Sequence, residues 1–139
     1  MVLTVERHEG GVALVTLSKN ASKNTFNSNN IDTLINSLEN LMEDNSCLSI
    51  IITGTGKFFS AGGSINEFAD AIDEGNIGSL VEEMTGKLHS LILKIRGSSK
   101  IFVAAINGSV AGGGLGLALA TDYRISISNA KLTAAFFPL

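Results

Sequence analysis

The chain has 139 residues, a net charge of −3 and an apolar content of 45%. These values suit one domain, predicted over residues 1–139, and exclude a disordered chain. The negative charge argues against nucleic-acid binding, and the single cysteine, Cys47, excludes a disulfide framework and a multi-cysteine metal site. The first residues, which include Glu6 and Glu9, do not resemble a signal peptide, so we expect a cytoplasmic protein.

The first third of the chain predicts a hairpin and a helix. Leu3–Glu9 and Val12–Leu17 are rich in strand-forming residues, and Gly10-Gly11 between them supports the positive φ of a tight turn. A cluster of capping residues at 27–30 then precedes apolar residues that recur at helical spacing over 31–42.

The middle of the chain predicts a strand followed by two helices. Leu48–Thr53 is a short apolar run of the kind found in buried strands. A short helix is expected over 65–71, after a glycine-bearing turn. Ser79 and Glu82 fit a capping box that would begin a longer amphipathic helix, with Gly97 as its C-cap.

The last third continues the alternation. Ile101–Ile106 predicts a second buried strand, the leucine and alanine residues at 117–120 predict a helix, and 122–128 alternates as a strand does. Residues 131–139 are apolar and carry no closing cap, so we expect the folding unit to use further polypeptide. Strands and helices that alternate in this way predict the α/β class.

Residues 101–121 carry no charge and contain small residues at the spacing of membrane packing motifs. However, Asn107-Gly108 and the three consecutive glycines at 112–114 would break a spanning helix, and no aromatic belt flanks the segment. We therefore expect no membrane span.

Two glycine-bearing turns, at 54–64 and 107–116, each follow an apolar strand and precede a helix. Glycine lets a ligand approach the backbone closely, and a helix N-terminus presents backbone N–H groups without partners. Two such groups that converge would stabilise an oxyanion or a polarised carbonyl.

Nucleotide binding is the alternative for the first turn. Gly54-Thr55-Gly56 begins a dinucleotide fingerprint, but Phe59 occupies the place of its third glycine. Gly56-Lys57 also fails the P-loop pattern, because Phe58 follows the lysine.

At these turns the chain resembles the crotonase superfamily, which includes the enoyl-CoA hydratases and isomerases. The segment from Asn107 to Ala118 fits the signature NG-x-x-x-GGG-x-x-LA. Phe59 to Ile65 is similar to the F-x-A-G-x-D-I turn, and Asn24 to Phe26 is similar to the N-A-L element. The family protein is about twice as long, so the chain is interpreted as its N-terminal half.

The resemblance implies a crotonase-like (ClpP/crotonase) α/β spiral of ββα units, here truncated, in a trimer or hexamer that binds acyl-CoA thioesters. The backbone N–H groups of Gly63 and Gly113 would form the oxyanion hole. Ala61 and Ile65, with Phe26, would line the substrate path.

Lys23 and Lys57 would meet the coenzyme A phosphates or adenine. Coenzyme A would enter as part of the substrate, with no tightly bound cofactor and no metal. No nucleic acid or membrane is expected among the partners.

The departures from the family pattern concern the acid and base. The resemblance implies that hydratases carry a glutamate where this chain has Gly116, and a second one near Phe136, which is also absent. The aspartate of the first turn is replaced by Ser64. A carboxylate elsewhere would then serve as base, and Asp70 is the candidate.

Two function hypotheses follow. The first is an acyl-CoA-binding protein with enoyl-CoA isomerase or hydratase-like chemistry. The second is a non-catalytic fragment that acts in binding or oligomeric assembly. Among residues with plainer explanations, His89 is predicted to lie on the surface, Cys47 in the core, and Asp122 to be structural.

Overall fold

The computed structural model describes residues 2–18 and 23–135 and arranges their strands in two sheets. The larger sheet has five strands in the order β1-β2-β3-β5-β7. Its members are β1 (Val2–His8), β2 (Val12–Ser18), β3 (Ser49–Gly54), β5 (Ile101–Ile106) and β7 (Tyr123–Ser126). Only β1 and β2 pair antiparallel, while the other neighbours are parallel. The predicted hairpin is confirmed, and Gly10 and Gly11 both have a φ of 75°.

The smaller sheet was not foreseen in the sequence. It has three strands in the order β4-β6-β8, namely β4 (Phe58–Ser60), β6 (Ser109–Ala111) and β8 (Leu132–Thr133). Its pairs are parallel. The sequence predicted only turns over the first two of these stretches, because a run of three residues is too short to show an alternating pattern.

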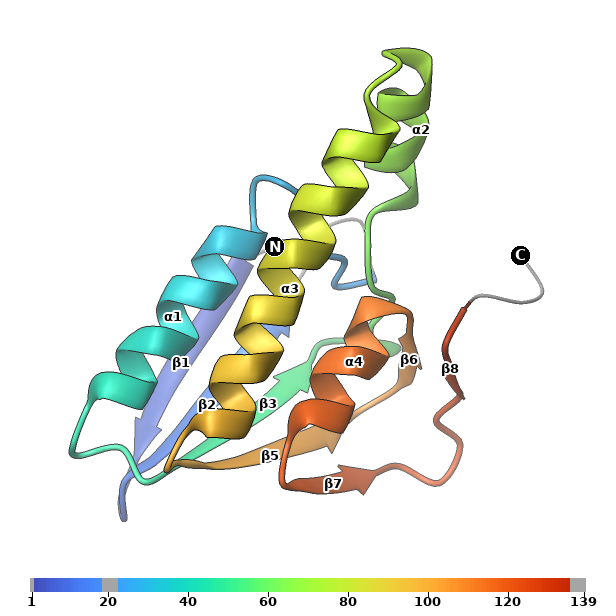
Figure 1. Cartoon of the computed structure of the whole chain (residues 1–139). Helices are drawn as coiled ribbons and strands as arrows, with labels where there is room; N and C mark the ends of the chain where they lie inside the picture. Colours follow the sequence, from blue (N-terminus) through green and yellow to red (C-terminus); the bar gives the residue numbers. More distant parts are fainter. Residues whose placement is uncertain (1, 19–22, 136–139) are drawn as a thin grey trace.

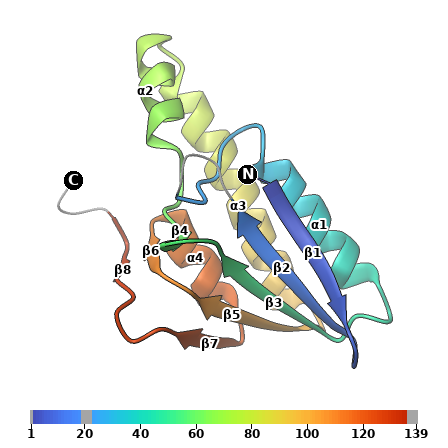
Figure 2. The same cartoon turned by 180° about the vertical axis from the view of Figure 1, so that it is seen from behind.

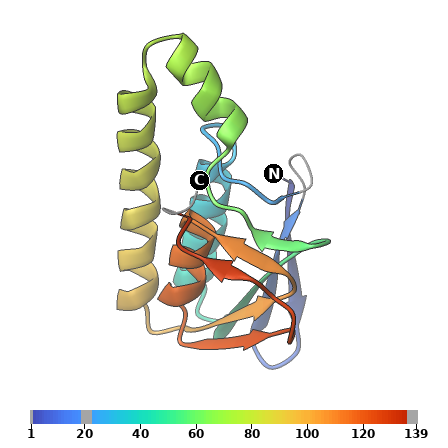
Figure 3. The same ribbon diagram turned by 90° about the vertical axis from the view of Figure 1, so that its right-hand side faces the viewer.

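The helices cover one face of the larger sheet. They are α1 (Ile31–Glu43), α2 (Ile65–Asp73), α3 (Ile77–Gly97) and α4 (Gly113–Ala120). Figure 1 shows α1, α3 and α4 over the same face, and Figure 2 shows the opposite face with no helix in front of the strands. The side view in Figure 3 shows α2 beyond the end of the sheet, joined to the far end of α3.

The core lies between the larger sheet and these helices. Alternate residues of the central strands point into it, and Ile50, Ile52, Phe102 and Ala104 are fully buried. Leu34 and Leu38 from α1, Leu91 from α3 and Leu117 from α4 are also fully buried. By contrast, Ala71 is the only buried residue of α2, so little apolar burial holds that helix in place.

Two of the predicted boundaries of α3 are wrong. The helix begins at Ile77 after Asn76, so Ser79 and Glu82 lie inside it and form no capping box. Gly97 is the last helical residue, and Ser98 follows as the C-cap in an extended conformation, with φ −74° and ψ 146°. The chain turns directly into the extended path towards β5, so no left-handed glycine is needed there.

The plainer predictions for single residues are confirmed. His89 is exposed, and Cys47 is fully buried. Asp122 is structural, because its Oδ2 accepts a hydrogen bond from the amide of Phe102 at 2.8 Å and its amide donates to the Phe102 carbonyl. These bonds join the end of α4 to the start of β5.

Ionic contacts fasten the helices to each other and to the hairpin. Lys87 of α3 binds Asp32 of α1 at 3.0 Å, and Lys94 pairs with Glu39 two turns further along. Asp44, which ends α1, accepts hydrogen bonds from the hydroxyl and the amide of Ser46 and pairs with Arg7 at 2.7 Å. The Ser46 hydrogen bonds and Arg7 lower the pKa of Asp44 to about 2.

The first prediction compares two glycines of α4. A Cβ at Gly114 would lie 2.5 Å from the Ser60 carbonyl oxygen, whereas a Cβ at Gly116 meets only Ile92 Cδ1, at an ordinary 3.5 Å. We expect Gly114→Ala to lower the free energy of unfolding by about 1–3 kcal/mol. Gly116→Ala should raise it by up to about 1 kcal/mol, because alanine is the better helix former. Urea denaturation of both variants measures this, and equal effects would contradict the close contact.

The second prediction concerns pH. The pKa of Asp44 falls on folding from its ordinary value of 3.8 to about 2. Its stabilising contribution is therefore present above about pH 4 and is lost as the pH falls through 2. We expect Asp44→Asn to lower the free energy of unfolding at pH 7 and to have a shrinking effect below pH 4. Denaturation series from pH 7 to pH 2.5 test this, with Asp73→Asn, an exposed acid on α2, as the control.

Candidate functional site

The two glycine-bearing turns contact each other through their backbones. A Cβ at Gly62 would lie 2.8 Å from the Gly113 amide nitrogen and 2.9 Å from the Ala111 carbonyl oxygen. Gly62 and Gly112 also have positive φ, at 82° and 52°. The two turns are therefore in close backbone contact, and this contact requires residues without side chains at Gly62 and Gly112.

The smaller sheet brings these turns together. β4 leads into the first turn and β6 into the second, and the two strands pair in parallel with Phe58 opposite Ser109. Helix α2 begins directly after the first turn, and α4 begins at Gly113 itself. Because parallel strands end at the same edge, both helix N-termini begin close to the point of contact.

Two asparagine side chains hold the strand ends that feed the turns. Asn107 Oδ1 accepts a hydrogen bond from the Gly54 amide at 2.8 Å, and its Nδ2 donates to the Phe58 carbonyl at 3.1 Å. Asn24 Nδ2 donates to the same carbonyl at 2.8 Å, and this residue is buried with a φ of 52°. Local sequence patterns mark Asn107 as part of a break and of the second motif, and they do not predict this supporting role.

The amides of Gly63 and Gly113 have the environment expected of hydrogen-bond donors to a ligand. Phe26 bridges the residues on either side of Gly63: its amide donates to Gly62 at 2.8 Å, and its carbonyl accepts from Ser64 at 2.9 Å. Gly113 is the first residue of α4, where an N–H has no acceptor within the helix. Neither the Gly63 nor the Gly113 amide donates to another residue that the structure describes.

Apolar side chains surround these two glycines. The ring of Phe68, from α2, has its Cζ 2.5 Å from the position of a Gly63 Cβ. Leu88 Cδ2, from α3, is 2.8 Å from the corresponding position at Gly113, and the Phe26 ring is 3.6 Å from it. An apolar environment strengthens hydrogen bonds to a developing negative charge.

The other predicted binding residues are spread around the turns. Phe26 is 2% exposed and adjoins both glycines. The Ala61 amide donates to the Lys23 carbonyl at 3.0 Å, so these two residues are neighbours. Ile65 is 74% exposed at the start of α2, and the side chains of Lys23 and Lys57 are exposed.

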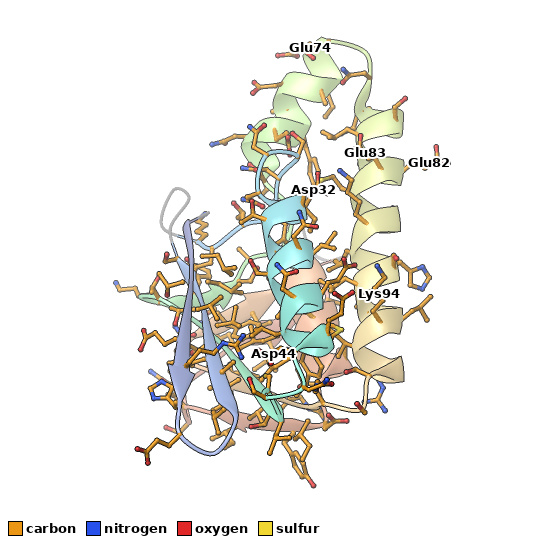
Figure 4. All side chains as sticks on the ribbon, turned by 90° about the vertical axis from the view of Figure 1, so that its left-hand side faces the viewer. Asp32, Asp44, Glu74, Glu82, Glu83 and Lys94 are labelled. Carbon is orange, nitrogen blue, oxygen red and sulfur yellow. The ribbon has the colours of Figure 1, made fainter. Side chains whose placement is uncertain are left out.

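Asp70, the candidate base, lies elsewhere on α2. It is exposed and lines a hollow of about 300 Å³ between α2 and α3, together with Glu67, Glu74 and Glu83. Figure 4 shows Glu74 and Glu83 at this end of the molecule. Neither Gly63 nor Gly113 lines the hollow, so in this arrangement Asp70 does not adjoin the two amides.

Of the two positions at which the family resemblance implies a glutamate, the structure describes Gly116 but not Phe136. Gly116 lies on α4 one turn after Gly113 and faces Ile92 of α3. Phe136 lies outside the described residues.

Within residues 2–18 and 23–135, no group of three or more acidic, histidine or cysteine side chains could hold a metal ion. No described helix is long and apolar enough to cross a membrane.

The comparisons with known proteins agree with this geometry. The family model described as enoyl-CoA hydratase/isomerase matches residues 7–139. The chain belongs to the enoyl-CoA hydratase/isomerase family. The resemblance to the crotonase superfamily is thereby confirmed, and the dinucleotide and P-loop alternatives for the first turn are set aside.

Relatives within the enoyl-CoA hydratase/isomerase family show what the match covers. A probable enoyl-CoA hydratase of Bacillus subtilis is 38% identical over 87% of this chain and 45% of its own length. The 2,3-dehydroadipyl-CoA hydratase of Escherichia coli is 32% identical over 86% of this chain and 44% of its own. The chain spans about half the length of the curated relatives it matches.

A solved structure from the same family confirms the fold. The enoyl-CoA hydratase from Thermoplasma volcanium aligns with a TM-score of 0.80 and 32% identity, over 95% of this chain and 50% of its own. The predicted ββα units correspond to β3-β4-α2 and β5-β6-α4. The crotonase-like architecture predicted from the motifs is therefore confirmed.

Proposed function

We propose that the chain binds the carbonyl of an acyl-CoA thioester with the amides of Gly63 and Gly113, and supports isomerase or hydratase-like chemistry through an enolate. One observation carries this proposal. The two amides belong to turns in backbone contact, one amide lies at a helix N-terminus, and neither donates to a described residue. The apolar rings and methyl groups beside them favour an acyl group over a water-soluble anion.

The chemistry follows from the placement of these donors. A base removes a proton from the carbon next to the thioester carbonyl, or from the carbon two positions further along, and the electron pair moves to the carbonyl oxygen. Two N–H groups that hold this oxygen stabilise its charge more in the enolate than in the ground state. Return of the proton to another carbon shifts the double bond, and no oxidant or reductant takes part.

Coenzyme A would bind as part of the substrate. The exposed lysines, Lys23 and Lys57, flank the backbone of the first turn and offer positive charge to its phosphates. Ala61 lies between Lys57 and Gly63 along the chain, and the exposed Ile65 follows Gly63 by two positions. We propose that both line the path of the pantetheine arm. Relatives named as CoA-thioester hydratases support this choice of substrate.

Isomerisation suits the described residues better than hydration. The family resemblance implies that hydratases add water with the help of two glutamates, and this chain has a glycine, Gly116, at one of the two positions. An isomerase needs only one base to move a proton between two carbons. We propose Asp70 for this role, which requires α2 to bring it nearer to the two amides than it is in the present arrangement. From the family resemblance, we also propose a cytoplasmic trimer or hexamer.

A second function is favoured by the same glycine. Without a glutamate at 116, the chain could bind acyl-CoA, or assemble with other copies, and not turn it over. Size-exclusion chromatography with light scattering, combined with an isomerase assay on a 3-enoyl-CoA, separates the two functions. Measurable turnover would exclude the non-catalytic one, whereas calorimetry that detects no acyl-CoA binding would contradict the main proposal.

The third prediction tests the Gly113 amide. Proline is tolerated at the first residue of a helix and removes the N–H. Gly113→Pro should therefore lower turnover by about 10²–10³, the effect of losing one oxyanion donor. Gly113→Ala retains the N–H, and the only close contact of its Cβ among the nearest atoms is with the terminal methyl of Leu88, while the Phe26 ring is at an ordinary 3.6 Å. Its loss of turnover should therefore be much smaller. Steady-state kinetics of both variants, with thermal unfolding as the folding control, make the comparison.

A result in which both variants lose turnover equally would contradict a role for this amide. If neither variant turns over and both still bind acyl-CoA as the wild type does, the carbonyl is held elsewhere.

The fourth prediction tests Asp70 as the base. Asp70→Asn keeps the shape of the side chain and removes its ability to accept a proton, so turnover should fall by about 10²–10⁴ while acyl-CoA binding is retained. Asp73→Asn, on the same helix and equally exposed, is the matched control. Unchanged turnover in Asp70→Asn would assign the base to a different group.

A further inference from the structure

We propose that Phe68 and Leu88 limit the length of the acyl chain that the site accepts. This inference rests on the proposed function of the two amides and adds a specificity-determining role for two residues that no sequence motif marked. The two side chains come from different helices, α2 and α3, and each one contacts a different amide-bearing glycine.

The contacts of Phe68 with Gly63 and of Leu88 with Gly113 are both close and both apolar. At Gly63 the nearest atoms to a Cβ position are Phe68 Cζ and Cε2, at 2.5 Å and 2.9 Å. At Gly113 the nearest atom is Leu88 Cδ2, at 2.8 Å. Each donor glycine therefore has one apolar side chain within 3 Å of its Cβ position, and no polar side chain is among the nearest atoms.

A bound acyl group must lie next to these side chains. A carbonyl oxygen that accepts from both amides lies about 3 Å from each nitrogen, and each nitrogen is only about 1.5 Å from the glycine Cα. The carbons attached to that carbonyl then lie in the same region as the side chains that pack against the two Cα atoms. On this proposal, the first carbons of the acyl chain lie against the Phe68 ring and the Leu88 methyl groups.

Burial separates these two residues from the third neighbour. Phe26 is 2% exposed and is fixed through its backbone to Gly62 and Ser64, so it forms a closed floor. Phe68 and Leu88 are only partly buried, which means that space beyond them is open to solvent. They form a wall between the amides and that space, and truncation of either one should connect the two.

Of the two side chains in this wall, Phe68 comes from the less firmly packed helix, α2. Ala71 is its only buried residue, and beyond its contact with α3 it is held by Glu67, which accepts hydrogen bonds from the amide and hydroxyl of Ser28. Phe68 follows Glu67 directly, so this polar contact fixes the start of the turn from which the ring projects. Leu88 lies near the middle of the long α3, which packs on the core through Leu91 and Ile95.

The test is binding of two acyl-CoA thioesters by calorimetry, because binding is measurable whether or not the chain turns substrate over. We expect the wild type to prefer butyryl-CoA to decanoyl-CoA. Phe68→Ala and Leu88→Ala should each shift the ratio of the two dissociation constants towards the longer chain by about tenfold or more, the size of effect that a change in apolar pocket volume produces.

Matched controls lie on the same two helices. Ile72→Ala on α2 and Leu93→Ala on α3 remove apolar side chains that are 61% and 64% exposed, and they should leave the ratio unchanged. Phe68→Leu, which keeps an apolar side chain of intermediate size, should give a smaller shift than Phe68→Ala. Thermal unfolding confirms that each variant is folded.

The outcomes separate this inference from the proposed function. If the wild type binds both thioesters and the ratio does not change in Phe68→Ala, Phe68→Leu or Leu88→Ala, the wall does not set chain length and the two amides remain candidates. If the wild type binds neither thioester, the proposed function fails and the inference is overturned with it. A shift in the control variants as large as in the wall variants would also overturn it.

Discussion

The backbone contact between the two glycine-bearing turns is the constraint on which the site depends. A Cβ would collide with backbone at Gly62, at Gly114 and at Gly108, where the Lys57 carbonyl oxygen would be 2.2 Å away. At each position only glycine lets β4 and β6 approach closely enough to pair, and α4 can then begin beside the first turn. The two turns come together because these positions carry no side chains that would hold them apart.

The contact between the turns shields the ends of the neighbouring strands from water, so the backbone N–H and C=O groups there need hydrogen-bond partners within the protein. Asn24 and Asn107 supply them, since both side chains donate to the Phe58 carbonyl, and Asn107 also accepts from the Gly54 amide. Buried backbone groups without partners are costly. The two asparagines therefore stabilise the strand end that leads into the first turn. Because they supply these hydrogen bonds, the side chains beside the two amides can be apolar.

The sequence predicted the larger sheet, its helices and the family from patterns that are local. Apolar runs such as Ile101–Ile106 and the spacing over 31–42 report burial directly, and the triple glycine marks the second turn. It could not predict β4, β6 and β8, because their pairing depends on residues that are distant in sequence, 51 positions for Phe58 with Ser109 and 22 for Val110 with Leu132, and not on alternation. For the same reason Phe68 and Leu88 were missed, because only the fold brings these two helix positions to Gly63 and Gly113.

The parallel pairing of β2, β3 and β5 has a consequence for how the protein folds. Neighbouring strands are distant in sequence, as the hydrogen bond from Thr53 to Ala105 across 52 residues illustrates. Non-local pairings close large loops before they gain contacts, so they fold slowly. The hairpin and α1 can form early from local contacts, whereas the turns meet only once β3 and β5 are aligned. The rate at which the two turns come into contact after dilution from denaturant should therefore equal the rate of sheet closure.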